Sequence, residues 1–465
     1  MKKNIFYLAS IFMTMLAVTT SCDDNDNDTP IIEPETLVEL SGTLNTQTLT
    51  KDKQYLLKGQ VFVGGTTATN QTLTIEPGTV IYGDKATKGT LIVTPGSKLI
   101  ADGTAAEPIV FTSALPAGAR DRGDWGGVII LGNAKVNQPS PAIEGITPAV
   151  IYGGTNDADN SGILRYVRIE FAGIELTPNN ETNSLTVGGA GSGTVIEHCQ
   201  TSFGGDDAFE FFGGAVNAKY LIAYATWDDS FDIDFGYSGK IQFGLDVRYP
   251  SYADQSGSNC IECDNGPNDN ATEFLTSGVL SNITSVGPRA VNNQSVNANY
   301  QHAIDLRRRT AINIVNSVFI GYPRGIRMNQ QTVYDNYNTG TAILKNNVLV
   351  ADLLTYSVGS GMTATATDIN TLWGATNTAI TGTDYPATLT SLGLSSNVFF
   401  GTSTSTGYNV NPNFAVTAGS LATGASFTDP KLTSLQNTTY VGAFGATDWT
   451  DGWAEFNPIG KVYAN

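Results

Sequence analysis

Two short stretches, DDAFEFF at residues 206–212 and DDSFDID at residues 228–234, contain the pattern that decides the fold. They match position by position at a spacing of 22 residues. Each begins with two aspartates and continues with apolar residues at alternate positions, which is typical of a strand with one buried face. A strand unit that returns at a fixed spacing of this length indicates a repeat architecture, in which each copy stacks on the next.

Looser copies of the unit continue towards the C-terminus. Each keeps an apolar, polar, apolar order, and they are Ile261–Glu262–Cys263, Ile304–Asp305–Leu306 and Ile326–Arg327–Met328. An earlier pair, LTIEPGTVI at 73–81 and LIVTPGSKL at 91–99, reads as a strand, a Pro-Gly turn and a second strand. The repeat, the 50 glycines and the low charged fraction of 15% predict an all-β chain that winds into a parallel β-helix.

These units resemble the right-handed parallel β-helix superfamily that includes pectate lyases and polygalacturonases. LTIEPGTVI, followed by LIVTPGSKLIADGTAAEPIVFTS at 91–113, is similar to the beginning of many secreted β-helix proteins. The resemblance implies a right-handed, single-stranded parallel β-helix, which we place at residues 38–345. Residues 346–465 lose the clean period, and we expect last coils, long loops and a C-terminal cap there, because an open β-helix end exposes strand edges.

The N-terminus has the layout of a secretory signal peptide. Lys2 and Lys3 precede an apolar run at 5–18, which is shorter than the ~20 residues of a membrane-spanning helix. The small residues before Cys22 resemble the lipobox of bacterial lipoproteins, so we expect residues 1–21 to be removed and Cys22 to carry lipid. Residues 22–37 begin with an acidic run and are predicted to form an extended tether.

The chain also resembles a family of Gram-negative surface lipoproteins that carry GDWGGVIILG (123–132), GDDAFEFFGG (205–214) and YVGAFGATDWTDGWAEFNP (440–458). The acidic residues after Cys22 are similar to the signal that sends some lipoproteins to the outer face of the outer membrane. Both resemblances imply an exported protein, anchored in the outer membrane by its lipid and facing the cell exterior. Neither implies a particular activity.

The net charge narrows the classes of ligand. The formal charge is −18, and removal of the signal peptide with its two lysines makes it more negative. Nucleic acid is excluded as a partner on this ground, because phosphate binding needs a basic surface. Divalent cations, cationic ligands and neutral glycans stay open.

Stacking of the repeat predicts which side chains share a row. The apolar positions of each strand should point into the coil, and the residues between them should point outward. One outward row then contains Glu210, Asp232, Glu262, Asp305 and Arg327, and the next contains Phe212, Asp234, Asp264, Arg307 and Asn329. Like charges at strand spacing repel, so the rows need protonation, a bound cation or arginines. The arginines of the next two coils can neutralise these acids. They are Arg307, Arg308, Arg309, Arg324 and Arg327.

Three interpretations of the acidic rows stay open. Calcium prefers oxygen ligands, and adjacent coils offer Asp232, Asp234, Glu262 and Asp264. A second interpretation is a catalytic carboxylate pair. In the third, the acids are structural, and turn N–H groups donate to Asp206, Asp207, Asp228 and Asp229.

A comparison with polygalacturonases gives one argument for the catalytic interpretation and one against it. Gly205-Asp206-Asp207 looks like the Gly-Asp-Asp element of polygalacturonases, which implies acid and base roles for Asp206 and Asp207. The Gly-His-Gly element that accompanies it there is missing, and neither His198 nor His302 has that context. The aspartate pair also repeats on the next coil, which favours an architectural role. A lyase would need an arginine or lysine base, so Arg307 remains a catalytic candidate.

The cysteines and aromatic residues complete the candidates. Cys199, Cys260 and Cys263 are predicted to be buried and free, because residues three apart in a strand point to opposite faces. Exposed aromatic rings near the acidic rows could stack on sugars. The aromatic residues in this part of the chain are Tyr224, Trp227, Tyr237, Tyr249 and Tyr252.

Together these patterns predict a lipid-anchored surface protein that binds an extracellular ligand, with polysaccharide favoured and calcium as a candidate cofactor. The candidate ligand-binding residues are Glu210, Trp227, Asp232, Asp234, Glu262, Asp264 and Asp305. A polysaccharide lyase or glycoside hydrolase on the same face is one alternative. A structural envelope protein is another.

The substitution Cys22→Ala removes the predicted site of lipid attachment. We expect the full-length variant to lose incorporation of a fatty-acid probe and to leave the membrane fraction of a Gram-negative host. The conservative change Ser21→Ala keeps a small residue before the cysteine and should leave labelling unchanged. Labelled, membrane-bound Cys22→Ala protein would show that the anchor lies elsewhere.

Overall fold

The computed structural model describes residues 37–65, 70–177, 180–381, 385–400 and 409–463. The predicted signal peptide, Cys22 and nearly all of the tether lie outside the described residues. The chain divides into Met1–Glu35 and a compact unit, Thr36–Asn465. Among the described residues, no helix is long and apolar enough to cross a membrane.

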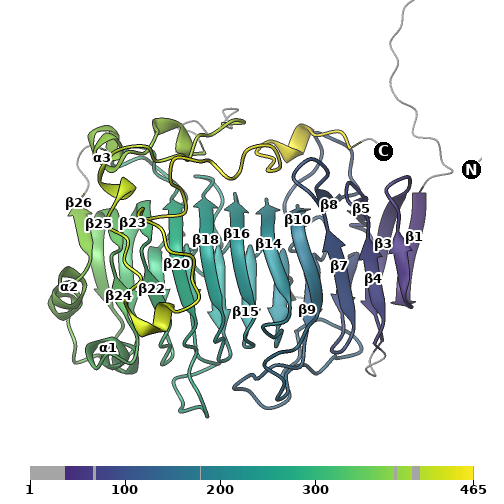
Figure 1. Cartoon of the computed structure of the whole chain (residues 1–465), viewed down its shortest axis with the longest axis horizontal. Coiled ribbons are helices and arrows are strands. Elements are labelled where there is room, and N and C mark those ends of the chain that lie inside the picture. Colours follow the sequence, from purple (N-terminus) through teal and green to yellow (C-terminus); the bar gives the residue numbers. More distant parts are fainter. Residues whose placement is uncertain (1–36, 66–69, 178–179, 382–384, 401–408, 464–465) are drawn as a thin grey trace, which may run out of the picture. The chain divides into compact units, whose positions relative to one another are not determined.

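The compact unit is a parallel β-helix whose coils have three faces (Figure 1). Each face is a parallel sheet. The first sheet contains β2 (Gln47–Leu49), β4 (Thr72–Ile75), β7 (Lys98–Asp102), β22 (Asn313–Val315), β24 (Leu344–Lys345) and the first halves of β10 (Gly162–Glu170), β14 (Val195–Ser202), β16 (Asn217–Tyr224), β18 (Lys240–Val247) and β20 (Val279–Val286).

The second sheet follows around a corner of each coil. It contains β5 (Val80–Gly83), β8 (Ile109–Ser113), the second halves of β10, β14, β16, β18 and β20, β26 (Thr378–Thr381), and the first halves of β1 (Leu37–Leu44), β3 (Gln54–Val63), β23 (Val318–Met328) and β25 (Val348–Val358).

The third sheet carries the acidic rows and is called the acidic sheet below. It contains β6 (Thr90–Val93), β9 (Val128–Leu131), β13 (Leu185–Gly188), β15 (Phe209–Phe212), β17 (Phe231–Asp234), β19 (Ile261–Cys263), β21 (His302–Leu306) and the second halves of β1, β3, β23 and β25.

The remaining elements lie outside the coils. A two-stranded antiparallel hairpin, β11 (Glu175–Thr177) and β12 (Asn180–Glu181), projects from the connection between β10 and β13. The helices are α1 (Gln331–Asn338), α2 (Ala366–Gly374) and α3 (Tyr385–Leu392), and the short 3-10 turns are η1 (Ser396–Val398), η2 (Ser420–Ala422), η3 (Pro430–Leu432) and η4 (Pro458–Gly460).

The interior of the coils confirms the predicted register. Phe209 lies opposite Phe231, and the same row continues through Ile261, Ile304 and Ile326. The rings of Phe209 and Phe231 are stacked, with centroids 5.8 Å apart. Parallel strands place equivalent side chains about 4.8 Å apart, so apolar rows pack continuously along the coil axis.

The three cysteines behave as the repeat predicts. Cys199 lies opposite Leu221 in the interior, and Cys263 continues the row of Ile233. All three are buried and free. They act as small core side chains in this fold.

A second row of side chains lies on the outside of the β-helix, at the corner between the first and second sheets. Tyr166, His198, Tyr220 and Phe243 lie in register, and each has a positive φ near +50 to +65°. Such a backbone costs about 1–2 kcal/mol for a residue with a side chain. Their rings stack with centroid distances of 4.5, 4.4 and 4.9 Å, which offsets part of this cost. His198 is therefore part of this stacked row.

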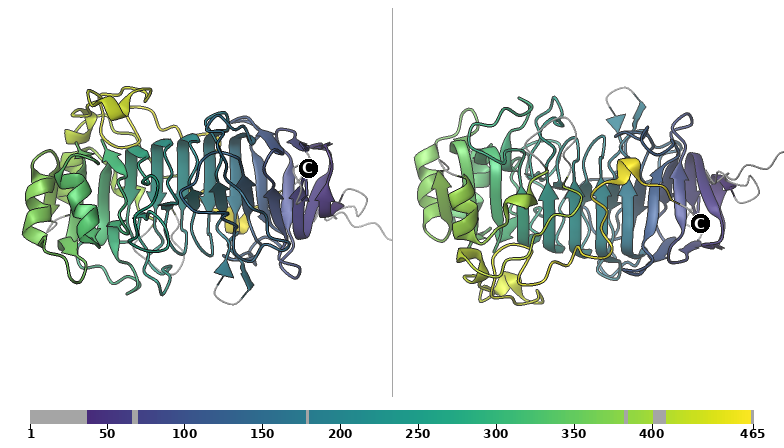
Figure 2. Two further views of the ribbon diagram at one scale, coloured as in Figure 1. Left: turned by 90° about the horizontal axis from the view of Figure 1, so that it is seen from below. Right: turned by 90° about the horizontal axis from the view of Figure 1, so that it is seen from above.

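Residues 409–463 form a C-terminal strap that returns along the β-helix towards its first coils (Figures 1 and 2). Ser426 exchanges two hydrogen bonds with Asn316, and Glu455 exchanges two with Gln200. The Tyr463 hydroxyl donates a hydrogen bond to Glu170, the last residue of β10. The order of these partners runs backwards through the sequence. The strap thus connects the coils to one another.

Apolar packing holds the strap on the outer face of the second sheet. Tyr224, which the sequence analysis offered as an exposed ring, is buried there against Phe400 and Phe456. Trp453 is 3% exposed and packs edge-on against Tyr166 and His198. These contacts form a second buried apolar cluster, outside the coils. The strap is therefore packed against the β-helix as an integral part of the fold.

The substitution Trp453→Ala should detach part of the strap. Truncating a buried tryptophan costs about 3–5 kcal/mol, so we expect a lower free energy of unfolding and faster proteolysis within the strap. Val462→Ala is the control, because that side chain is on the same strap and 67% exposed. Equal denaturant midpoints for the two variants would contradict the packing role of Trp453.

Candidate functional site

One outward row runs along the whole acidic sheet and changes character on the way. Phe62, Ile92 and Ile129 are succeeded by Thr186 and then by Glu210, in register. The row continues as Asp232, Glu262, Asp305 and Arg327, as predicted. The site therefore begins at the coil where the apolar row becomes acidic.

The connection between β9 and β10, residues 132–161, covers the apolar part of this row. Ile146, Val150 and Tyr152 from this loop pack in one cluster with Phe62 and Ile129. The loop reaches the start of the acidic part, where Glu210 is only 9% exposed. The acidic rows are thus largely buried, and they do not form the open face that an outward row implies.

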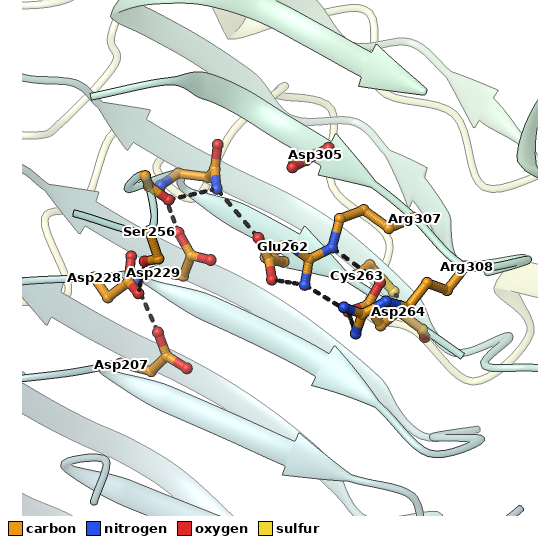
Figure 3. Close-up of polar contacts among 12 residues, drawn as sticks. Asp207, Asp228, Asp229, Ser256, Glu262, Cys263, Asp264, Asp305, Arg307 and Arg308 are labelled. Carbon is orange, nitrogen blue, oxygen red and sulfur yellow. Dashed lines mark hydrogen bonds and ion pairs between the residues drawn. The ribbon is translucent and has the colours of Figure 1, made fainter. Parts of the chain in front are cut away.

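Arginines neutralise the C-terminal half of the rows. Of the five predicted arginines, Arg307, Arg308 and Arg327 do so, whereas Arg309 pairs with Asp269 outside the rows. The guanidinium of Arg307 lies between Glu262 and Asp264, as Figure 3 shows, and its Nε is 3.0 Å from Asp264 Oδ1. Arg308 also donates to Asp264, at 2.8 Å. Arg327 makes a two-point contact with Asp305, which is fully buried.

Arg307 is consequently held as a cation. Burial disfavours its charge, but the hydrogen bond to Asp264 and the charge of Glu262 outweigh burial and raise the pKa of Arg307. A catalytic base must release its proton, so this environment opposes the predicted role of Arg307 as a base.

In the part of the chain that the structure describes, no arginine neutralises the acids in and beside the N-terminal half of the rows. Among the described residues, no ion pair reaches the carboxylates of Asp206, Asp207, Glu210, Asp228, Asp229, Asp232 or Asp234. Burial and then the charge of Asp228 raise the pKa of Asp206 well above its ordinary value. Burial also raises the pKa of Asp228 to about 6 and that of Asp234 to about 7. Burial and mutual repulsion therefore disfavour the ionised forms of these acids.

Two of the predicted acids have a structural role. Asp207 Oδ1 accepts from the backbone N–H of Asp229 at 2.8 Å, and Asp229 Oδ1 accepts from that of Asn259. Asn183 precedes them and accepts from the N–H of Asp207 at 3.2 Å. One such side chain per coil ties successive turns together. The structural interpretation is thus confirmed for Asp207 and Asp229.

Packing also explains why residue 205, the first of the Gly-Asp-Asp element, is a glycine. A Cβ at this position would lie 2.5 Å from the carbonyl oxygen of Gly173, in the neighbouring coil. Only glycine allows that backbone approach. The resemblance to the polygalacturonase element is therefore explained here by the packing of two coils.

Three groups of acids place their oxygens close enough to share a cation. Their ligand atoms lie within 4.8 Å of one another, and the groups are Asp206–Asp207–Asp228, Asp207–Glu210–Asp232 and Asp229–Asp232–Glu262. Of the predicted metal ligands, Asp232 and Glu262 belong to these groups. Asp234 and Asp264 do not belong to any of them. Asp228 Oδ1 and Asp232 Oδ1 are buried and have no hydrogen-bond partner.

An acidic pocket of about 320 Å³ opens at the start of these groups. Its acids come from three places: Glu144 on the β9–β10 loop, Glu181 on the β11–β12 hairpin, and Asp206, Asp207 and Glu210 at β15. Tyr152, Phe212 and Phe235 supply an aromatic wall. Sequence reasoning found the acids of β15 and missed the loop residues, since insertions between strands follow no period.

The other predicted residues lie apart from this pocket. The Trp227 ring is stacked under the guanidinium of Arg122, 3.5 Å from the ring centroid, and its Nε1 donates to Asp254. Tyr237 is fully buried in the core. Tyr249 and Tyr252 contact each other near Trp227. These rings pack with protein groups, and none of them lines the acidic pocket.

Comparison with known proteins agrees with the fold. A family model described as a pectate-lyase-like β-helix domain matches residues 42–392. This span contains all three sheets of the β-helix except the first half of β1, and it contains the whole acidic pocket. No curated protein and no solved structure matches the chain significantly.

The buried acids predict an unusual pH dependence of stability. The pKa of Asp234 rises from 3.8 to about 7 on folding, so its protonated form is favoured in the folded chain. In chelator, the contribution of this group to stability should therefore be largest at and below pH 4 and fall as the pH rises to 7, by roughly 3 kcal/mol. Denaturant unfolding across this range measures the loss.

Asp234→Asn should flatten this pH profile, because asparagine cannot ionise. Asp335→Asn, at an exposed position of α1, should leave the profile unchanged. Stability that rises between pH 4 and pH 7 in both variants and in the parent chain would contradict the assignment.

Proposed function

Because the chain belongs to the family of pectate-lyase-like β-helix domains, we propose that it is a lipid-anchored surface protein that binds polysaccharide in the acidic pocket, together with a divalent cation. The observation that carries the proposal is the composition of the pocket. Uncompensated carboxylates lie beside an aromatic wall, in a family whose description points to carbohydrate. The lipid on Cys22 and the outward-facing location are parts of the proposal that rest on the sequence.

The cation follows from the charge of the site. Buried carboxylates that share a site cannot all ionise unless something neutralises them. Asp232 belongs to two of the three oxygen groups and has a buried oxygen without a partner. Calcium takes six to eight oxygen ligands, so the protein groups would leave positions for other oxygens. Saccharide hydroxyls or water would complete that shell.

The aromatic wall gives the saccharide a second contact. Sugar rings present C–H faces, which pack against aromatic rings, and hydroxyls, which bond to carboxylates and amides. The Phe212 and Phe235 rings have centroids 4.9 Å apart. Asn183 and Thr186 lie on the polar side of the same pocket. A pocket lined by both apolar and polar groups suits a ligand with both kinds of surface.

Binding is favoured over cleavage by what the candidate catalytic groups already do. Arg307 is neutralised by two carboxylates, and Asp207 ties two coils together. A lyase or hydrolase would need groups free to exchange protons with the substrate. The acids that remain for that task are Asp206 and Glu210, and the experiment below includes a readout for cleavage.

We expect the full-length protein, purified in detergent, to bind glycans on an array in calcium and to lose most of that binding in chelator. Asp232→Asn removes a carboxylate from two oxygen groups and should weaken calcium binding by about tenfold or more in calorimetry. Asp335→Asn is the matched control. Reducing-end and unsaturated-product assays on the bound glycans should stay at background.

The opposing results are distinct. Glycan binding that persists in chelator would remove the cation from the proposal and leave carbohydrate binding standing. Product formation would make the protein an enzyme. Binding to no glycan with or without calcium would overturn the proposal and favour a structural envelope role.

A further inference from the structure

Among the described residues, the acidic and basic side chains that line the acidic pocket are all acids. There are five of them, and no lysine, arginine or histidine lines the pocket in this part of the chain. The closest arginines along the rows, Arg307 and Arg308, already neutralise Glu262 and Asp264. The pocket therefore favours a ligand group that is positively charged, and it repels a carboxylate or a sulfate.

A cation bound among the strands leaves part of this charge in place. The oxygen group Asp207–Glu210–Asp232 reaches the pocket through Asp207 and Glu210. Glu181 and Asp206 also line the pocket and do not belong to this group. A metal ion bound there therefore leaves these two acids in place, and a second positive group would still be attracted.

Tyr152 provides an independent sign of a missing ligand group. Its side chain is 2% exposed and lines the pocket, and its hydroxyl has no hydrogen-bond partner. A buried hydroxyl normally has a partner, because loss of its hydrogen bond to water is otherwise uncompensated. A phenol can accept a hydrogen bond as well as donate one, whereas the carboxylates around it can only accept when ionised.

A protonated amine can bond to several of these groups at once. An ammonium has three N–H donors, so it can bond to two carboxylates and to the Tyr152 oxygen at once. The faces of Phe212 and Phe235 attract a cation and pack against a sugar ring. The volume of about 320 Å³ leaves room for a ring around the amine.

We propose that the acidic pocket selects saccharide units that carry an unsubstituted, protonated amino group, held among Tyr152 and the acids that line the pocket, Glu181 included. This inference rests on the proposed function and narrows its ligand to amino sugars without an N-acyl group. Acylation removes the charge and two of the three donors, so the pocket should discriminate strongly against the acylated unit.

The test compares two trisaccharides that differ only in acylation. Calorimetry of the full-length protein in calcium, with glucosamine trisaccharide and with N-acetylglucosamine trisaccharide, should show at least about tenfold tighter binding of the free amine. Binding of the amine should weaken as salt is added and as the pH rises through the pKa of the sugar amine.

Variants assign the effect to the pocket. Glu181→Gln should weaken binding of the amine by about three- to tenfold. Glu175→Gln is its matched control, because Glu175 pairs with Glu181 across the same hairpin and does not line the pocket. Tyr152→Phe should weaken amine binding while the denaturant midpoint stays equal or rises, since the hydroxyl has no partner to lose. A circular dichroism spectrum confirms that each variant is folded.

Each result decides between the two proposals. Equal or tighter binding of the acetylated trisaccharide overturns the amine inference. Binding of neutral or acidic glycans on the array without binding of glucosamine trisaccharide also overturns it and leaves the proposed function intact. No binding of any glycan overturns both. Tighter amine binding that Glu181→Gln does not change shows that the amine binds elsewhere, which contradicts the site.

Discussion

Parallel stacking in register is the constraint on which the rest of this structure depends. Each side chain lies about 4.8 Å from the side chain at the same position of the next coil, so a repeat places like beside like. Apolar residues gain from this arrangement, as the stacked Phe209 and Phe231 show. Acidic residues are destabilised by the same arrangement, because their negative charges then repel one another along a row. The same geometry thus produces both the core and the electrostatic problem of the acidic sheet.

The chain resolves that problem differently along the row. Towards the C-terminus, Arg307 and Arg327 neutralise the acids of their neighbouring coils. Towards the N-terminus, no basic side chain in the described part of the chain forms an ion pair with the row, and the β9–β10 loop shields Glu210 from water. Carboxylates that are buried and unmatched store unfavourable free energy that a bound cation would release. That stored energy makes this end of the row the functional end in our proposals.

The strap solves a different consequence of the coil. A corner with positive φ turns four aromatic side chains outward, and the outer face of the second sheet is also apolar. Both surfaces would be exposed without a cover. Phe399, Phe400 and the strap provide it, with Trp453 against the corner and Phe456 against the sheet. The last residues of the chain thereby hold coils that are far apart in sequence.

The repeat in the sequence determined the β-helix, the rows of the acidic sheet, the buried cysteines and the arginine match, because register follows from a period that is visible at 206–212 and 228–234. It also indicated that Asp207 and Asp229 are structural, since both recur with the coil. Only the tertiary structure decided that the rows are buried, that Tyr152 and Glu181 complete a pocket, and that the C-terminal residues run back along the coils. Those features depend on insertions and on contacts between residues hundreds of positions apart, for instance Tyr463 with Glu170, and neither leaves a period for sequence reasoning to detect.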